Sequence, residues 1–349
     1  MPQVVQSPQE FIIIGENIHA TRVVLVRGER TTTLEDGSEA VVFQGASGDE
    51  RHLRVPESYK STQPYQQGHV KHFMIAIQKG MGDDPAEQEE GKAYIHYEVE
   101  RQQAAGAHFL DLNVDEISYD LEIQKKAMKW LVGTVQELAE IPPSVDSSNS
   151  GIIEVGLSEY DGRAGRPTIN SAALERPETL DLVKAFDARV IITAAGIDGM
   201  PSDAQERVEN VRALMEAVRS RDISLKDVFI DCLVFPISVA PDYGKHFLDA
   251  VREVRKIFGE AVHVTGGLSN VSFGLPNRKL INNTFIHLSL EAGIDTGIID
   301  PIQSRIDEVF ELELDSDGVG MARDMLLGRD EYCVNYIQAW REGKLSWNR

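Results

Sequence analysis

Eight short apolar runs, separated by longer amphipathic segments, constrain the fold of this 349-residue chain more than any other feature. Each run is rich in β-branched residues or leucine and lacks clean two-residue alternation, which is typical of strands buried on both faces of a parallel sheet. The runs are FIIIG (11–15), HFLDLNV (108–114), PPSVD (142–146), RPTIN (166–170), RVIITAAG (189–196), VFIDCLVFP (228–236), AVHVTGGLSN (261–270) and TGIID (296–300). The alternation of such runs with helical segments indicates an α/β fold.

Three of the intervening segments, 120–139, 203–219 and 243–258, carry apolar residues at helical spacing. No GxGxxG turn follows the first run, so the fingerprint of a doubly wound dinucleotide-binding sheet is missing. Eight strands with helices between them fit a closed (β/α)8 TIM barrel better, and such barrels are single domains of about 250 residues or more. We therefore expect residues 1–349 to form one TIM-barrel domain.

One segment, residues 22–68, departs from this rhythm directly after the first run. Its first part contains RVVLV, TTTLEDGSEAVVFQ and RHLRV, with a turn signal at Asp36-Gly37. Short strands joined by such turns predict a small antiparallel β-meander inserted after the first strand. Two interpretations stay open: a peripheral decoration of the barrel, or a lid or docking surface near its active-site face.

Composition excludes several classes of function. The net charge of −21 argues against a nucleic-acid backbone or an anionic membrane as the main partner. The two cysteines, Cys232 and Cys333, form no CxxC pair, so neither a disulfide framework nor a thiolate zinc site is predicted. The first residues lack the pattern of a signal peptide, and no apolar run approaches the roughly 18 residues that span a bilayer. We therefore expect a cytoplasmic protein.

Polar side chains end the apolar runs, at the edge where (β/α)8 barrels hold their active sites. They are acidic, amide or hydroxyl groups, with no lysine or histidine among them. The set comprises Glu16, Asp111, Asn113, Asp146, Asn170, Asp231, Ser269, Asn270 and Asp300. A pterin presents a ring N–H beside an exocyclic amine, and one carboxylate can accept hydrogen bonds from both. The set therefore suits a ligand of this kind.

Some of these residues also have a purely structural interpretation. Asp146, at the start of DSSN, could cap the following helix, and Asn270, near two glycines, could be a turn residue. Asp231 is harder to explain in this way, because a carboxylate in an apolar run needs a partner. A divalent metal could also use an acidic ring, but no DxD, HxxE or histidine cluster supports one. We interpret DSDG (315–318) as a turn and expect no metal site.

Several segments together resemble the methyltetrahydrofolate:corrinoid methyltransferases, which are pterin-binding barrels related to dihydropteroate synthase. They are GENIH (15–19), LDLNVD (110–115), VDSSN (145–149), INSA (169–172), FIDCLVFPISVA (229–240), GGLSNVSFGLPNRKLINNTF (266–285), AGIDTGIIDP (292–301) and EYCVNY (331–336). The GLSNVS and NRxLIN strings are specific when they occur together. The resemblance covers residues 11–20 and 69–345 and implies the TIM-barrel fold.

The resemblance also implies methyl transfer between 5-methyltetrahydrofolate or tetrahydrofolate and the cobalt of a corrinoid (cobalamin) that a separate protein carries. It implies pterin-binding roles for Asp111, Asn113, Asp146, Asn170, Asp231, Gly267, Ser269, Asn270 and Arg278. Asn270 would be the catalytic residue beside the methyl-bearing nitrogen. Glu16 would be a further contact, although Asn17 follows it where the family has arginine. The expected partners are the corrinoid protein, the folate and a second copy of the chain in a homodimer.

Two alternative functions stay open. A dihydropteroate synthase-like pterin enzyme would share the fold, although its NxTPDSF-type motif and Lys-rich diphosphate-binding end are missing. A non-catalytic folate-binding barrel would bind the pterin without methyl transfer. The chain also departs from the family at TAAGID (193–198) and in the 22–68 insertion, which leaves the identity of the partner undetermined. No DxHxxG string, by which corrinoid domains supply a histidine to cobalt, is present, so we expect the corrinoid to come from the partner.

Overall fold

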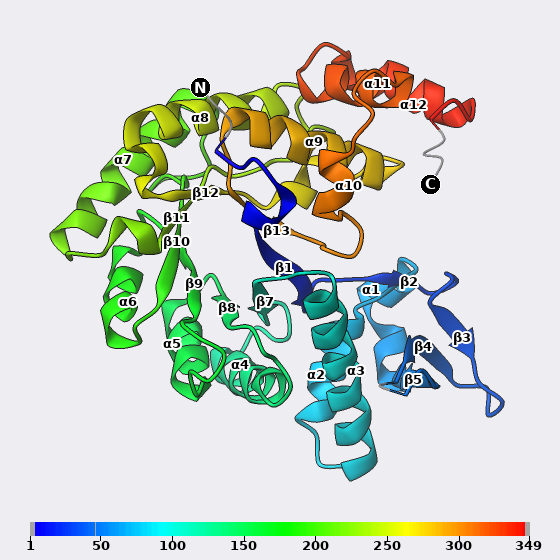
Figure 1. Ribbon diagram of the computed structural model, residues 1–349. Coiled ribbons are helices and arrows are strands. Elements are labelled where there is room, and N and C mark those ends of the chain that lie inside the picture. The colour runs from blue at the N-terminus through cyan, green and yellow to red at the C-terminus, as the bar shows by residue number, and fades with distance from the viewer. Residues whose placement is uncertain (1–3, 46, 346–349) are drawn as a thin grey trace. The chain divides into compact units, whose positions relative to one another are not determined.

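The computed structural model describes residues 4–45 and 47–345, and it has the α/β fold class that the sequence predicts. Eight strands form one sheet in the order β12, β11, β10, β9, β8, β7, β1 and β13 (Figure 1). The two strands at the ends of this order are also joined. The N–H of Ile298 donates to the carbonyl of Gly266 at 3.0 Å, and Gly267 forms a parallel bridge with Ile298. This order and this bridge are those of the predicted (β/α)8 barrel.

Each of the eight predicted runs contributes one strand to the sheet. The strands are β1 (Ile12–His19), β7 (Phe109–Asn113), β8 (Pro143–Asp146), β9 (Thr168–Ala172), β10 (Arg189–Thr193), β11 (Val228–Asp231), β12 (His263–Thr265) and β13 (Thr296–Ile299). The largest difference concerns β12, because the predicted run continues to Asn270 while the strand ends at Thr265. Leu268–Ser272 form a 3-10 helix, η6, so Ser269 and Asn270 lie in this helix and not at the end of a strand.

Helices connect the strands. The three predicted helical segments become α4 (Leu121–Gln136), α7 (Ala204–Ser220) and α8 (Tyr243–Phe258). The others are α1 (Gln63–Gln66), α2 (His72–Gly80), α3 (Pro85–Ala104), α5 (Ser150–Glu159), α6 (Asp181–Ala185), α9 (Arg278–Ala292), α10 (Ile306–Phe310), α11 (Asp317–Leu326) and α12 (Val334–Arg341). The DSDG segment was predicted as a turn; Asp315 and Ser316 lie in the turn, whereas Asp317 and Gly318 begin α11. Within residues 4–45 and 47–345, no helix has both the length and the apolar character that crossing a membrane requires.

Further 3-10 turns are η1 (Pro8–Glu10), η2 (Glu57–Ser61), η3 (Pro177–Leu180), η4 (Leu225–Asp227), η5 (Gly259–Ala261) and η7 (Glu331–Cys333). The chain forms two compact units: a larger unit of residues 1–14 and 169–349, and a smaller unit of residues 15–168. In the larger unit, β10, β11 and β12 pair in parallel register, with Thr193 opposite Asp231 and Asp231 opposite Thr265. In the smaller unit, β7 pairs with β8, with Asn113 opposite Asp146. The expectation of a single domain stays a prediction.

The insertion is antiparallel, as predicted, but its first segment pairs differently. β3 (Thr31–Thr33), β4 (Glu39–Gln44) and β5 (Glu50–Arg54) form a three-stranded meander. The RVVLV segment does not join it, because β2 (Val24–Leu25) lies antiparallel to β6 (His69–Val70). The chain therefore enters the insertion through β2 and leaves it through β6, and these two ends pair with each other.

The meander is fixed to α2 and α3, beside which it lies (Figure 1). The Nη2 of Arg30 donates to the hydroxyl of Tyr94 at 2.7 Å, and this hydroxyl lies 2.8 Å from Nδ1 of His72. Phe43 on β4 meets the ring of Tyr94 edge to face, with ring centroids 5.0 Å apart. Burial lowers the pKa of His72 well below its usual value, and the neighbouring arginine charges add to this effect. These contacts favour a fixed decoration over a mobile lid, and a docking surface stays open.

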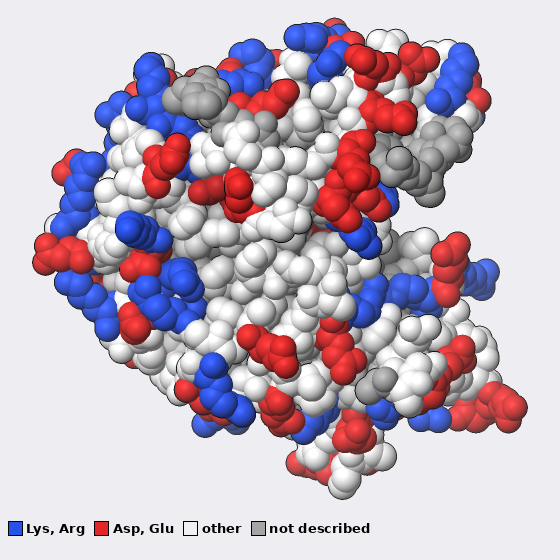
Figure 2. All heavy atoms as spheres, in the orientation of Figure 1, with Lys and Arg blue, Asp and Glu red and all other residues white. Residues whose placement is uncertain are grey.

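Charged side chains of opposite sign alternate on the helix surfaces. On α7, Glu209 and Glu216 are interspersed with Arg212 and Arg219. Figure 2 shows the resulting mixture of red and blue over this helix, at the left of the view. Arg219 and Glu216 form an exposed ion pair at 3.6 Å, of the kind that adds little to stability. The visible surface of α7 therefore offers no basic stripe, in keeping with the net charge of −21.

Candidate functional site

In the smaller unit, the carboxyl ends of β7 and β8 carry Asp111, Asn113 and Asp146. Asp111 and Asn113 are two residues apart on β7, so their side chains lie on the same face of the strand. The Nδ2 of Asn113 donates to Oδ2 of Asp146 at 2.9 Å. Asp111 is 3% exposed and Asn113 5% exposed, whereas Asp146 is half-buried. The structure therefore joins Asn113 and Asp146 by a hydrogen bond, with the buried Asp111 on the same face of β7 as Asn113.

Asp146 does not cap the helix that follows it. The cap of α5 is Asn149, whose Oδ1 accepts a hydrogen bond from the N–H of Gly151 at 2.9 Å. The intervening turn is held by Asp115, whose carboxylate accepts from the Ser147 hydroxyl at 2.6 Å. The side chain of Asp146 is thus outside the capping network, and the helix-cap interpretation of this residue is wrong.

His19 belongs to the same group, and the sequence analysis missed it. Its Nε2 lies 3.5 Å from Oδ2 of Asp146, and its Nδ1 lies 2.7 Å from the hydroxyl of Thr21. Burial lowers the pKa of His19, but the hydrogen bond and charge of Asp146, with the charge of Asp111, outweigh burial and raise it overall. The expectation that no histidine lies among these side chains is therefore wrong. β1 extends three residues past Glu16 and ends at His19, the last residue of GENIH. The presence of His19 in this motif was the sequence signal that could have identified it.

His19→Gln is expected to remove a pH-dependent part of the stability. Because the folded state raises the pKa of His19, it binds this proton more tightly than the unfolded chain does. The stabilising contribution is fully present below the unfolded pKa of about 6.5 and is lost as the pH rises through the folded value. Urea unfolding of wild type and His19→Gln should thus differ most in mildly acid buffer. A difference that is independent of pH, or that survives in the Asp146→Asn background, would contradict this assignment.

Glu16 is held by an arginine of the insertion. The Nη2 of Arg22 donates to Oε1 of Glu16 at 2.6 Å and to Oδ1 of Asn17 at 3.1 Å. The Nδ2 of Asn17 in turn donates to the buried carboxylate of Glu98 at 2.9 Å. Although no arginine follows Glu16 directly in the sequence, the fold places the guanidinium of Arg22 against its carboxylate. A ligand contact of Glu16 stays a prediction.

In the larger unit, Asp231 ends β11 between apolar neighbours and has a backbone partner. It is 9% exposed, and its Oδ1 accepts a hydrogen bond from the N–H of Leu233 at 2.7 Å. Asn170 on β9 is likewise 9% exposed. A carboxylate offers about four acceptor positions, and a ligand contact of Asp231 stays a prediction.

Arg278 binds the backbone of η6. Its Nη2 donates to the carbonyl of Ser269 at 2.8 Å, and its Nε donates to the hydroxyl of Ser272 at 2.9 Å. Its guanidinium also lies over the ring of Phe273, 4.6 Å from the centroid. Arg278 therefore fixes the turn that carries Asn270, and a direct contact with a ligand stays a prediction.

Asn270 contributes to the η6 turn through its backbone groups and not through its side chain. Its N–H donates to the carbonyl of Gly267 at 3.0 Å, and its carbonyl accepts from the N–H of Phe273 at 3.2 Å. A Cβ at position 267 would come within 2.8 Å of the Asn270 amide nitrogen, so a side chain at this position would displace the Asn270 amide. Among the residues that the structure describes, the half-buried side-chain amide has no hydrogen-bond partner. The amide is thus in position to bond with something outside the protein.

Asp300 has a local structural role. It follows β13, and its Oδ1 accepts from the N–H groups of Ile302 at 3.0 Å and Gln303 at 3.2 Å. This is the turn-forming behaviour of an aspartate that begins a loop. Within the described ranges, no three His, Cys, Asp or Glu side chains are grouped so that they could hold a metal ion.

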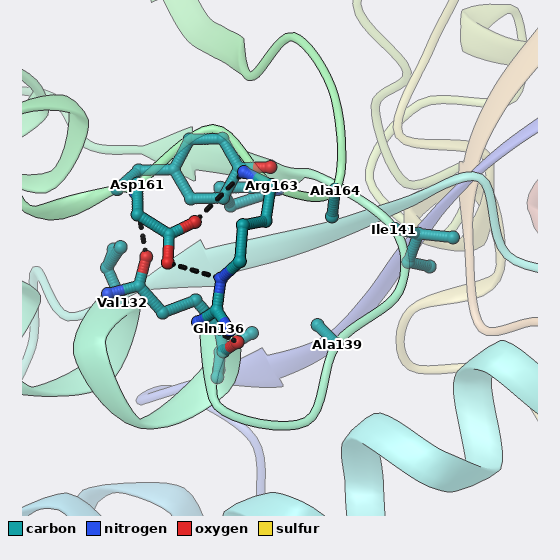
Figure 3. A pocket seen from close by; sticks show the side chains of 10 residues that line it. Val132, Gln136, Ala139, Ile141, Asp161, Arg163 and Ala164 are labelled. Atoms are coloured by element: carbon teal, nitrogen blue, oxygen red, sulfur yellow. Dashed lines mark hydrogen bonds and ion pairs between the residues drawn. The ribbon is translucent and has the colours of Figure 1, made fainter.

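A small hollow in the smaller unit lies at the amino end of β8, which begins at Pro143, and not at its carboxyl end (Figure 3). Its polar side chains bond to one another. The Nε of Arg163 donates to Oδ2 of Asp161 at 2.6 Å, and the N–H of Asp161 donates to Oε1 of Gln136 at 2.9 Å. The remaining lining is largely apolar, from Val132, Ala139 and Ile141 among others. Because its polar groups are paired internally and Asp146 lies at the opposite end of the strand, we assign no ligand to this hollow.

Known proteins resemble the chain over most of this region. The family described as pterin binding enzyme matches residues 88–300, which include β7 to β13. The methylcorrinoid:tetrahydrofolate methyltransferase of Eubacterium limosum is 29% identical over 265 residues, covering 74% of this chain and 91% of that protein. The methionine synthase of Mycobacterium leprae (strain TN) is 32% identical over 210 residues. This second match covers 57% of the chain but 17% of the methionine synthase.

A solved structure resembles the chain in fold. Dihydropteroate synthase from Stenotrophomonas maltophilia, with imidazole bound in its active site, superposes with a TM-score of 0.50 at 13% identity. The superposition covers 65% of this chain and 87% of that one. At this identity the likeness concerns the fold alone, and it agrees with the barrel derived from the strand order.

Proposed function

The chain belongs to the pterin binding enzymes, and from this premise we propose that it moves a methyl group between a tetrahydrofolate and a corrinoid. The observation that carries the proposal is the hydrogen-bonded pair of Asn113 and Asp146 at the ends of β7 and β8, with the buried carboxylate of Asp111 two residues before Asn113. The E. limosum relative, matched over 91% of its length, is named for methyl transfer between a methylcorrinoid and tetrahydrofolate. The second relative is named a methionine synthase, and the match covers 17% of it.

The pterin ring is the group that the polar residues recognise in this proposal. The carboxylates of Asp111, Asp146 and Asp231 accept hydrogen bonds from its ring N–H and exocyclic amine, and a charged acceptor strengthens such bonds. The amides of Asn113 and Asn170 serve its mixed donor and acceptor atoms. The η6 residues Gly267, Ser269 and Asn270 approach the reacting end of the ligand, with Arg278 holding their backbone. Glu16, paired with Arg22, is a further contact.

The chemistry is a displacement at the methyl carbon. In the direction away from folate, the bond from the pterin nitrogen to the methyl carbon breaks as the bond from that carbon to cobalt forms. An amine leaves poorly unless it is protonated or strongly hydrogen-bonded, so the protein contributes positioning and hydrogen bonding and forms no covalent intermediate. The Asn270 amide can rotate to donate to this nitrogen or to accept from its protonated form. An amide is not a net acid, so the proton itself comes from solvent or a carboxyl group.

The test is direct methyl transfer with small molecules. The protein is incubated with 5-methyltetrahydrofolate and free cob(I)alamin, and methylcobalamin is followed by absorbance. The reverse reaction, from methylcobalamin to tetrahydrofolate, is followed in the same way and decides the direction. Tetrahydrofolate binding without transfer in either direction would favour a non-catalytic folate-binding barrel. Formation of dihydropteroate from its precursors would favour the synthase.

The corrinoid should be absent from the isolated protein. The chain has no DxHxxG string, so we expect the purified protein to be colourless and to accept its corrinoid from a partner protein. Cobalt analysis and the visible spectrum should be at background before and after incubation with cobalamin and desalting. A bovine serum albumin sample treated in parallel measures carry-over. Stoichiometric cobalt in the freshly purified protein would contradict the partner assignment.

The cellular setting and the assembly complete the proposal. We place the enzyme in the cytoplasm, where folates and a corrinoid protein are both available to it. We propose a homodimer, and sedimentation equilibrium of the 38.8 kDa chain distinguishes it from a monomer.

A further inference from the structure

Arg207, on the first turn of α7, is a charged side chain buried in the larger unit. It is 0% exposed, and its hydrogen bonds go to backbone carbonyls. Nε donates to Cys232 at 2.9 Å, Nη1 to Asp203 at 2.7 Å and Nη2 to Leu233 at 3.5 Å. Among the residues that the structure describes, no carboxylate forms an ion pair with it. Burying a guanidinium costs free energy, so this position calls for a physical reason.

The conformation of Cys232 and Leu233, the two residues that follow Asp231, explains why Arg207 is buried here. Leu233 has a φ of 60°, in the left-handed region that leucine rarely adopts. In this conformation its N–H points back and donates to Oδ1 of Asp231 at 2.7 Å. The same guanidinium binds the carbonyls of Cys232 and Leu233, and therefore fixes the peptide planes on both sides of the strained residue. Phe235 lies against the guanidinium, 4.8 Å from the ring centroid.

We infer that Arg207 is a positioning residue that holds the Cys232–Leu233 turn in the conformation in which Leu233 binds and orients the Asp231 carboxylate. Arg207 is fully buried beneath the turn, so it acts through Asp231 and not by touching a ligand. The inference deepens the proposed function and rests on it for the role of Asp231 in pterin binding. The geometry of the turn itself does not depend on that role.

Lysine at position 207 separates the charge of Arg207 from its geometry. A guanidinium presents five N–H donors in a rigid plane, whereas an ammonium is a point charge with three donors on a flexible stem. Lysine would keep the positive charge near Asp231 but could not bind three carbonyls set around a plane. If the charge alone mattered, Arg207→Lys would behave like wild type.

Arg255 provides a control in the same unit. It is 3% exposed, and it donates to the carbonyls of Gly293 at 2.6 Å, Val262 at 2.7 Å and Gly259 at 2.9 Å. Unlike Arg207, it also pairs with a carboxylate, that of Asp295 at 2.9 Å. The carbonyls that it binds lie in the segments that enter β12 and β13, and none belongs to the Cys232–Leu233 turn. Arg255→Lys therefore removes a buried carbonyl-binding guanidinium while leaving the Leu233 turn intact.

The first measurement needs no ligand. Amide hydrogen exchange of the full chain is followed at Leu233 in wild type, Arg207→Lys and Arg255→Lys. We expect faster exchange at Leu233 in Arg207→Lys, with unchanged protection in the middle of α7, and wild-type exchange at Leu233 in Arg255→Lys. Phe235→Leu, which removes the ring against the guanidinium, gives a milder variant should Arg207→Lys fail to fold. Wild-type protection at Leu233 in a folded Arg207→Lys protein, or in Phe235→Leu where that variant replaces it, would overturn the inference.

The second measurement is a double-mutant cycle on the Kd for tetrahydrofolate. We expect Arg207→Lys to weaken binding about tenfold to a hundredfold, the range found when residues that orient a binding group are removed. In the Asp231→Asn background the same substitution should have almost no further effect, because both act through one carboxylate. Additive effects would overturn the inference. If wild type binds no tetrahydrofolate, the proposed function fails, and the exchange of Leu233 still decides whether Arg207 fixes the turn.

Discussion

Asp231→Asn is expected to weaken tetrahydrofolate binding by about 1.5–3 kcal/mol, or roughly tenfold to a hundredfold in Kd. The substitution changes almost no volume, but it replaces one carboxylate oxygen by an NH₂ group. An asparagine can still accept the hydrogen bond from Leu233 with its remaining oxygen, so the turn keeps its partner. Its NH₂ group then meets the N–H groups of the pterin edge, and two donors face each other. Asp231 is 9% exposed, so little water is available to relieve this mismatch.

Asp300→Asn is the matched control for this prediction. Asp300 also follows a strand of the larger unit, but its Oδ1 is used by the N–H groups of Ile302 and Gln303. Its substitution should leave the Kd for tetrahydrofolate unchanged. Binding is measured by fluorescence titration, and the melting temperature of each variant is recorded on the same preparation. A Kd equal to that of wild type in Asp231→Asn would remove Asp231 from the pterin site.

The positions of the eight strands could be predicted because burial leaves a direct trace in the sequence. A strand covered on both faces, such as β10 or β11, is apolar over consecutive residues and shows no alternation, and this pattern occurs in short runs. The ends of the strands could not be predicted in the same way. Most of residues 266–272 are buried like β12, but Leu268–Ser272 form a 3-10 helix. Burial patterns report where a residue is hidden, and not which backbone hydrogen bonds it makes.

The strand pairing of the insertion and the full set of site residues could not be predicted for one shared reason. Both depend on which residues meet in the fold, and the sequence does not show this. Nothing in RVVLV indicates that β2 pairs with β6, more than forty residues later, because two-residue strands carry no alternation. Asp146 was predicted, but its choice between capping and site roles depended on Asn149 and Asp115, which take over the turn. His19 was missed because a single histidine has no spacing to other polar residues that would distinguish it. Its role appears only through its distance from Asp146.

Asn270→Ala should lower the rate of methyl transfer by about two to three orders of magnitude, or about 2.7–4 kcal/mol in activation free energy, the cost of losing one hydrogen bond that stabilises a transition state. Folate binding should weaken much less. The reason is that the bond to the pterin nitrogen strengthens as that nitrogen gains its proton, so it favours the transition state over the bound substrate. The single-turnover rate to cob(I)alamin and the Kd for methyltetrahydrofolate are measured on one preparation.

If Asn270 is only a turn residue, its substitution should lower stability and leave the transfer rate unchanged. The structure allows this interpretation to be distinguished from the catalytic one. The backbone of Asn270 makes the turn bonds with Gly267 and Phe273, and alanine can make both. Because the side-chain amide has no hydrogen-bond partner among the described residues, its removal should leave no buried group unpaired, and the melting temperature should change little. Asn149→Ala gives the contrasting signature, since losing the α5 cap costs about 0.5–2 kcal/mol of stability while the rate per folded molecule is kept. If Asn270→Ala behaves like Asn149→Ala, losing stability but transferring methyl groups at the wild-type single-turnover rate, then Asn270 is a turn residue. The proton-dependent hydrogen bond to the pterin nitrogen must in that case come from another side chain.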